Sequence, residues 1–166
     1  MDGWNRIVWR QFGAAIDMLD GALAACPGRV WDDPDDPPRS RFWYMAYHCL
    51  FFLDLYLTGE SEGWHPPAPF TLDEGDPRGL LPERTFAKGE LRGYLAFSRR
   101  KCRATLEALT DERAGRLCRF PWGEMSFGEL LLDNMRHVQH HTAQLNLVLR
   151  RKTDSAPPWI ASVREA

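Results

Sequence analysis

The 166-residue sequence lacks the features that assign a chain to several large classes of protein. It has no excess of charge, since 21 Lys and Arg stand against 23 Asp and Glu, and this balance disfavours nucleic acid as a partner. Its longest apolar run, residues 42–57, is interrupted by His48 and Asp54 and is too short for a membrane span. We therefore expect a protein with neither a nucleic-acid nor a membrane partner.

Cysteine is also scarce, and its spacing excludes two kinds of site. The four cysteines lie at positions 26, 49, 102 and 118, without a C-x-x-C pair and without the close spacing of a disulfide-stabilised scaffold. The first residues, MDGWNRIVW, show no basic segment followed by an apolar stretch, as a secretory signal would. Reduced thiols and a cytoplasmic location are the simplest expectation.

Apolar residues recur at the period of an amphipathic helix over most of the chain. This pattern predicts helices over residues 4–26, 86–109 and from about 126 to 152, the last opened by a Ser126/Glu129 capping box. Residues 41–57 are apolar nearly all the way round, as in a helix enclosed by others, and Gly59 is a plausible stop. We expect an all-α fold, a four-helix bundle that forms a single domain over residues 1–166.

The segments between these helices carry the signals of loops. Residues 59–82 hold five Pro and four Gly, and a loop of 24 residues in a compact domain is usually a lid, a binding loop or a disordered excursion. Trp64 and Phe70 could anchor it, and the run DEGDP, residues 73–77, reads as a solvated turn. A short turn of helix over 111–117 and a loop RFPWGEM complete the prediction, which contains no strand.

Three of the five histidines lie in the last predicted helix, and helical geometry separates them. His137 and His141 are four residues apart on one edge of the apolar stripe, so both can reach one divalent ion, whereas His140 projects outward. His48, in the middle of the second predicted helix, would be the third ligand. The alternative is a core histidine that is hydrogen-bonded to a carbonyl or a tyrosine. Spacing alone leaves both interpretations open.

The segments YMAYHCLFFLDLYL and HVQHHTAQLNLVLRR, in this order of elements, resemble the DinB-like (damage-inducible) superfamily over nearly the whole chain. The resemblance implies a bundle that holds a divalent metal through His48, His137 and His141. Zn²⁺ is the first choice, with Ni²⁺, Fe²⁺ and Mn²⁺ as alternatives. Thr142 and Ala143 stand where the common pattern H-H-R-G-Q-L has Arg and Gly, which leaves the ligand positions intact.

The resemblance also implies candidate activities, because some similar proteins are thiol S-transferases or isomerases that use low-molecular-weight thiols. A three-histidine ion with an open position lowers the pKa of a bound thiol or water, so a metal-dependent hydrolase is the alternative activity. A non-enzymatic, stress-related bundle protein with a structural or vestigial metal is a third hypothesis. We expect a small-molecule substrate and a homodimer.

Two further residues could bind that substrate. Arg41 and Tyr44 lie two turns and one turn before His48 on the same helix stripe. Arg41 would suit an anionic group of the substrate, although it could equally be a helix-end residue that extends to water. Tyr44 could donate a proton, although a buried tyrosine more often only packs.

Overall fold

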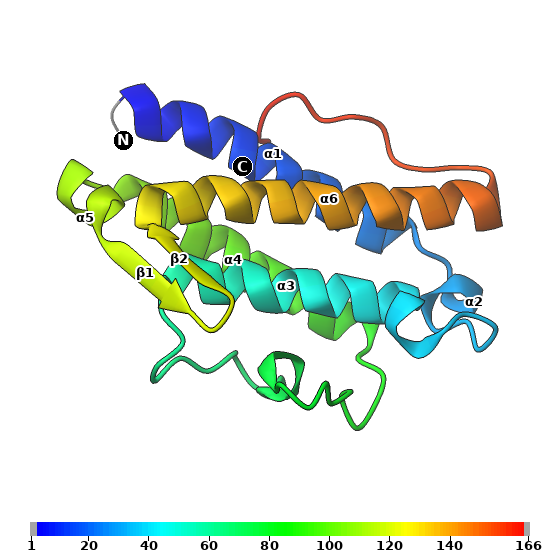
Figure 1. The fold of residues 1–166 in the computed structure, drawn as a ribbon. Coiled ribbons are helices and arrows are strands. Elements are labelled where there is room, and N and C mark those ends of the chain that lie inside the picture. Colours follow the sequence, from blue (N-terminus) through cyan, green and yellow to red (C-terminus); the bar gives the residue numbers. More distant parts are fainter. Residues whose placement is uncertain (1–2, 165–166) are drawn as a thin grey trace.

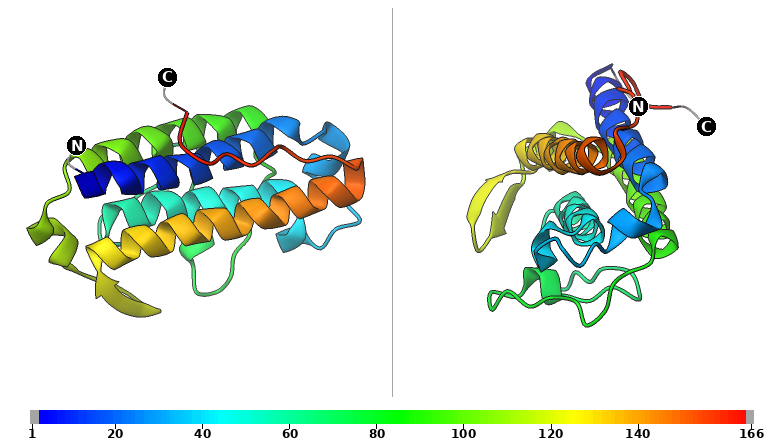
Figure 2. Two further views of the ribbon diagram at one scale, coloured as in Figure 1. Left: turned by 90° about the horizontal axis from the view of Figure 1, so that it is seen from above. Right: turned by 90° about the vertical axis from the view of Figure 1, so that its right-hand side faces the viewer.

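The computed structural model describes residues 3–164, and four long helices dominate it (Figure 1). Helix α3 packs on α6 and α4, and α1 packs on α4 and α6, so the four lie side by side (Figure 2). The prediction of a mostly helical chain is confirmed, and the predicted helix ends differ from the observed ones by one or two residues. The four long helices are α1 (Gly3–Ala25), α3 (Phe42–Thr58), α4 (Lys88–Glu107) and α6 (Phe127–Thr153).

Local sequence signals explain where α6 begins and where α3 ends. The Ser126 hydroxyl accepts a hydrogen bond from the Glu129 amide at 3.4 Å, and the Glu129 carboxylate accepts one from the Ser126 amide at 3.0 Å. This is the predicted capping box. Helix α3 stops at Gly59, whose φ of 80° is left-handed, and a Cβ there would lie 2.9 Å from the Phe127 ring.

Residues 111–126 contain the main departure from the predicted fold. A short helix, α5 (Asp111–Gly115), is followed by the antiparallel strands β1 (Leu117–Phe120) and β2 (Gly123–Ser126), with Cys118 opposite Met125. The prediction of a chain without strands is therefore wrong here. Strands of four residues are too short for an apolar alternation to stand out, and Gly123, with φ of 151°, allows the tight turn between them.

The long loop after α3 is fastened to the helices by aromatic side chains. Phe70 stacks on Tyr94 of α4 with ring centroids 4.5 Å apart, and Trp64 meets Phe51 of α3 edge-on at 4.9 Å. Both side chains are buried, so the predicted anchors are confirmed. The loop passes below α3 in Figure 1 and contains one short helical turn, η2 (Asp73–Gly75).

Two short elements and the C-terminal segment complete the fold. Helix α2 (Gly28–Trp31) and the turn η1 (Pro38–Ser40) connect α1 to α3. After α6 the chain runs back along α1, where the Val163 amide donates to the Arg10 carbonyl at 2.9 Å. No helix within residues 3–164 combines the length and the apolar character needed to cross a bilayer.

Helix α3 also carries a buried carboxylate near its C-terminal end, which forms an ion pair with a partly exposed lysine. The Asp54 side chain is 1% exposed and its carboxylate accepts hydrogen bonds from the Tyr94 hydroxyl at 3.0 Å and from the Lys101 ammonium. Lys101 also donates to the Thr58 hydroxyl at 2.6 Å. The buried charge of Asp54 in α3 is thus satisfied by a cation and a hydroxyl donor from α4.

Candidate metal centre

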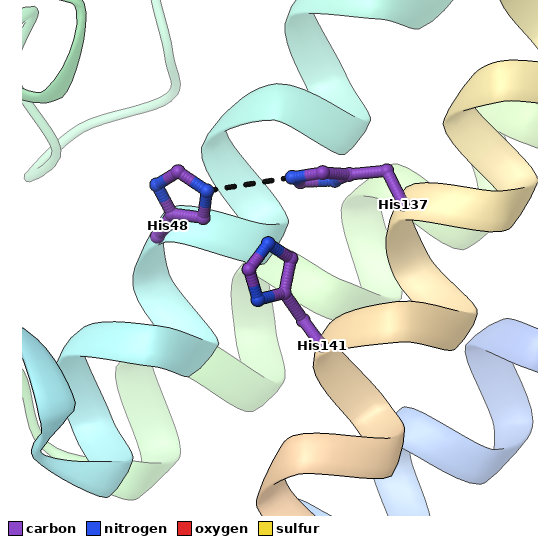
Figure 3. Close-up of side chains that lie close together, drawn as sticks. All are labelled: His48, His137 and His141. Atoms are coloured by element: carbon purple, nitrogen blue, oxygen red, sulfur yellow. Dashed lines mark hydrogen bonds between the residues drawn. The ribbon is translucent and has the colours of Figure 1, made fainter.

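Three histidine rings converge in the space between α3 and α6 (Figure 3). One ring nitrogen from each of His48, His137 and His141 lies within 4.8 Å of the other two. The Nε2 atoms of His48 and His137 are 3.4 Å apart. The Asn134 amide, one turn before His137, donates to the Leu53 carbonyl at 3.0 Å and thereby fixes α6 against α3 at this level.

Hydrogen bonds on the outer side of two rings determine which nitrogen faces the centre. His48 Nδ1 is 2.6 Å from a Glu74 carboxylate oxygen, and His141 Nδ1 is 2.8 Å from the Gln144 side-chain oxygen. An oxygen acceptor at Nδ1 favours the tautomer with its proton there, which leaves the Nε2 lone pair free. The buried Nδ1 of His137 has no partner among residues 3–164.

Burial keeps two of the rings neutral. Burial first, and then the neighbouring histidines, lower the pKa of His137 to about 3 and that of His141 to about 4. Both rings are therefore uncharged at neutral pH in the absence of a metal. A neutral imidazole with a free lone pair is the form that coordinates a metal ion.

The other candidates from the sequence lie elsewhere or are already engaged. His140 is exposed on α6 and does not belong to the cluster of converging nitrogens. The Arg41 guanidinium bonds the Asp32 carboxylate at 2.9 Å and the Asp36 carbonyl at 3.3 Å. These contacts give no support to its predicted role in binding an anionic substrate group, which stays a prediction.

Glu74 is the residue of this site that the sequence did not reveal. It belongs to the DEGDP run, which was predicted to be a solvated turn, but its side chain is only 5% exposed. One carboxylate oxygen contacts His48 and the other accepts a 2.7 Å hydrogen bond from the Tyr44 hydroxyl. Burial and then Glu74 raise the pKa of Tyr44. The role of Tyr44 in binding substrate stays a prediction.

An aromatic surface adjoins the histidines on the side of the β-hairpin. The Phe52 ring lies 4.9 Å from the His48 ring and 5.7 Å from the His137 ring, measured between centroids. Trp122, at the hairpin turn, is 5.8 Å from Phe52 and 54% exposed, and it stacks on Phe120. The centre thus has a polar side at Glu74 and an aromatic side that reaches solvent at Trp122.

Comparison with known proteins points to one family. A family model described as the DinB superfamily matches residues 11–145. The crystal structure of a DinB-like protein from Bacillus subtilis is similar, with a TM-score of 0.59 and 16% sequence identity over 95% of this chain and 99% of that one. At this identity the similarity establishes the fold alone. No protein with curated annotation matches the chain.

Proposed function

The chain belongs to the DinB superfamily, and on this basis we propose a four-helix bundle that binds one divalent metal ion to activate a small thiol or water. The observation that carries the proposal is the convergence of His48, His137 and His141. One ring nitrogen of each histidine lies within 4.8 Å of the other two, so all three could bind a single ion.

The residues fit a metal of the zinc type. Two nitrogens bound tetrahedrally at about 2.0–2.1 Å from Zn²⁺ lie roughly 3.3 Å apart. The His48 and His137 Nε2 atoms are separated by 3.4 Å. Neutral imidazoles also suit Ni²⁺ and Fe²⁺, while Mn²⁺ is a weaker match because it favours oxygen ligands.

The number of ligands favours catalysis over a structural role. Structural zinc sites are normally closed by four protein ligands, whereas catalytic sites have three and leave one position for water or substrate. Only the three histidines meet here among residues 3–164, and the four cysteines are buried elsewhere as free thiols. A divalent ion held by three imidazoles would lower the pKa of a thiol or water that takes the remaining position.

The surrounding residues would then act on the substrate. Phe52 and Trp122 offer an apolar, partly exposed surface on one side of the histidines, which suits the carbon skeleton of an organic substrate. Tyr44 contacts Glu74 next to the centre, and its hydroxyl already donates its hydrogen bond to the Glu74 carboxylate. We expect Tyr44 to support that carboxylate and to contact the substrate only secondarily.

The first experiment is metal analysis of protein purified without a histidine tag. We expect close to one divalent ion for each chain by plasma mass spectrometry. Ala variants of His48, His137 and His141 should each lose most of it, while His140→Ala should keep it, because His140 lies outside the cluster. If all four variants retain metal, the ion is bound elsewhere and the proposal is wrong.

A second experiment separates the candidate activities. Metal-loaded protein is incubated with a chlorinated dinitrobenzene and a panel of small thiols, and with ester substrates in the absence of thiol. Thiol transfer predicts metal-dependent conjugation, and the alternative, hydrolysis, predicts ester cleavage. Stoichiometric metal without activity on either panel would favour the non-enzymatic hypothesis.

We also propose a homodimer. Trp4 and Ile7 of α1 and Leu132 of α6 are exposed, and Trp4 and Leu132 line one cavity together with apolar residues of α4 and α5. Exposed apolar surface of this kind is typical of a subunit interface. Sedimentation equilibrium should give twice the 19.1 kDa monomer mass. A purely monomeric species at micromolar concentration would contradict the dimer.

A further inference from the structure

We propose that Glu74 is a positioning residue of the metal centre, and that through it the loop between α3 and α4 is coupled to metal binding. Its carboxylate would hold the His48 ring with Nε2 directed toward His137 and His141. This role rests on the proposed function, because the ion is the ligand to which the loop would respond.

The hydrogen bonds of Glu74 are those of a fixed carboxylate. Its side chain is 5% exposed, and its two oxygens lie 2.6 Å from His48 Nδ1 and 2.7 Å from the Tyr44 hydroxyl. A buried carboxylate is costly unless donors satisfy it, so the His48 proton is drawn to Nδ1. The Nε2 lone pair is then the one left for an ion.

The loop places this carboxylate through contacts of its own. Just before η2, the Thr71 carbonyl accepts a hydrogen bond from the Tyr47 hydroxyl of α3 at 3.3 Å. Just after Glu74, the Gly75 backbone lies so close to the Phe51 ring that a Cβ there would be 3.3 Å from it. Anchors on both sides of Glu74 therefore hold the loop backbone against α3 through contacts that do not involve the three histidines.

Two consequences follow for metal binding. Removing a hydrogen-bond partner behind a metal-ligating histidine typically costs 10–100-fold in metal affinity. The coupling must be reciprocal, since a contact that strengthens metal binding is itself strengthened when metal binds. The ion should therefore tighten the loop around Glu74 although it touches no loop residue.

Metal affinity is the first test, measured with Zn²⁺ against a chromophoric chelator. Glu74→Ala should weaken binding by roughly 10–100-fold. Glu74→Gln keeps an oxygen that can accept from Nδ1 but loses the charge, so its affinity should fall between wild type and Glu74→Ala. Gln144→Ala is the matched control at His141, where the acceptor is an exposed neutral amide, and it should cost less.

Orientation is tested separately from affinity, in metal-free protein. Nitrogen-15 NMR of the imidazoles should show His48 as the Nδ1–H tautomer in the wild type and in Glu74→Gln, and as a mixture in Glu74→Ala. In the metal-loaded protein, the Co²⁺ visible spectrum should change in Glu74→Ala and be largely restored in Glu74→Gln. A residue that only stabilises the fold would leave the tautomer unchanged.

Hydrogen exchange tests the coupling to the loop. Zn²⁺ should slow amide exchange over residues 71–77 in the wild type and have little effect there in Glu74→Ala. Wild-type affinity, tautomer and spectrum in Glu74→Ala would overturn the proposal. If the wild type binds no metal, the proposed function fails, and the His48 tautomer in metal-free protein then decides the role of Glu74 alone.

Discussion

Helix α3 carries two polar side chains six residues apart, and their surroundings differ. Asp54 is 1% exposed, and its carboxylate meets the Lys101 ammonium and the Tyr94 hydroxyl, so donors and acceptors are matched. His48 has a side chain that is 28% exposed, and its Nε2 points toward the ring nitrogens of His137 and His141. The first cluster pairs a negative charge with a positive one, whereas the second brings together three ring nitrogens that could hold one metal ion.

On the proposed function, the difference is that between a structural polar cluster and a metal-binding one. An ion pair whose two charges are both satisfied within the protein needs no ligand. Removing one member leaves the other charge without its partner. His137 can donate to His48 across the 3.4 Å between their Nε2 atoms, but the three ring nitrogens have no single partner in common within residues 3–164. Replacing Asp54 should therefore lower the stability of the metal-free protein. Replacing one of the three histidines should mainly reduce the stabilisation that added metal gives.

The largest effect is expected at the ion pair. Asp54→Ala leaves the Tyr94 hydroxyl without its acceptor and the Lys101 ammonium without its counter-ion, and should lower the free energy of unfolding by about 3 kcal/mol. The loss should be the same in zinc and in chelator, as measured by denaturant titration. Arg103→Ala, which breaks an exposed pair with Glu107, is the control and should cost under about 0.5 kcal/mol. A loss seen only with zinc would assign Asp54 to the metal centre.

Zinc should stabilise only chains with all three histidines. At a free concentration 100 times the dissociation constant, an ion that binds only folded protein adds about 2.7 kcal/mol. Thermal melts should show this gain in the wild type and in His140→Ala, and not in Ala variants of His48, His137 or His141. A destabilised His48→Ala that still responds fully to zinc would instead support the core-histidine interpretation.

Lowering the pH should destabilise the metal-free protein through the rings of His137 and His141. The folded-state pKa values of about 3 for His137 and about 4 for His141 lie below the ordinary 6.5. Below pH 6.5 the unfolded chain therefore binds more protons than the folded chain. The free energy of unfolding is therefore unaffected by these two rings above about pH 6.5 and falls as the pH drops toward the folded-state pKa values. Each ring should lower it by up to about 1.4 kcal/mol for each pH unit.

The measurement is unfolding in chelator at several pH values between 7 and 5. The double variant His137→Ala/His141→Ala should show a flatter profile than the wild type over this range. Equal slopes in the two proteins would mean that these rings do not resist protonation as their burial predicts.

The smallest effect is expected at the aromatic side of the centre. Trp122→Ala should leave metal content unchanged and lower stability by about 0.5–1.5 kcal/mol, from its stacking on Phe120. In whichever activity assay responds, KM should rise several-fold with kcat nearly unchanged, because Trp122 would contact only the carbon skeleton. Loss of metal from this variant would show instead that the hairpin supports the histidines.

Much of the fold and part of the site were predictable from local sequence. The apolar period placed four helices to within two residues, the Ser126/Glu129 pair and Gly59 marked helix ends, and the four-residue spacing of His137 and His141 put them on one face. These signals depend on residues close together in the chain. Membership of the family was predicted from the two histidine segments and is confirmed over residues 11–145.

Other features depend on contacts between distant segments. Glu74 meets His48 across 26 residues of sequence because aromatic anchors fold the loop back onto α3, and no local pattern encodes that path. Arg41 is paired with Asp32, which approaches from the connection between α1 and α3. The sequence by itself determined which residues form helices and which histidines share a face, since periodicity and capping act within one or two turns. Only the tertiary structure decided which carboxylate stands behind His48, because that choice depends on how the loop packs.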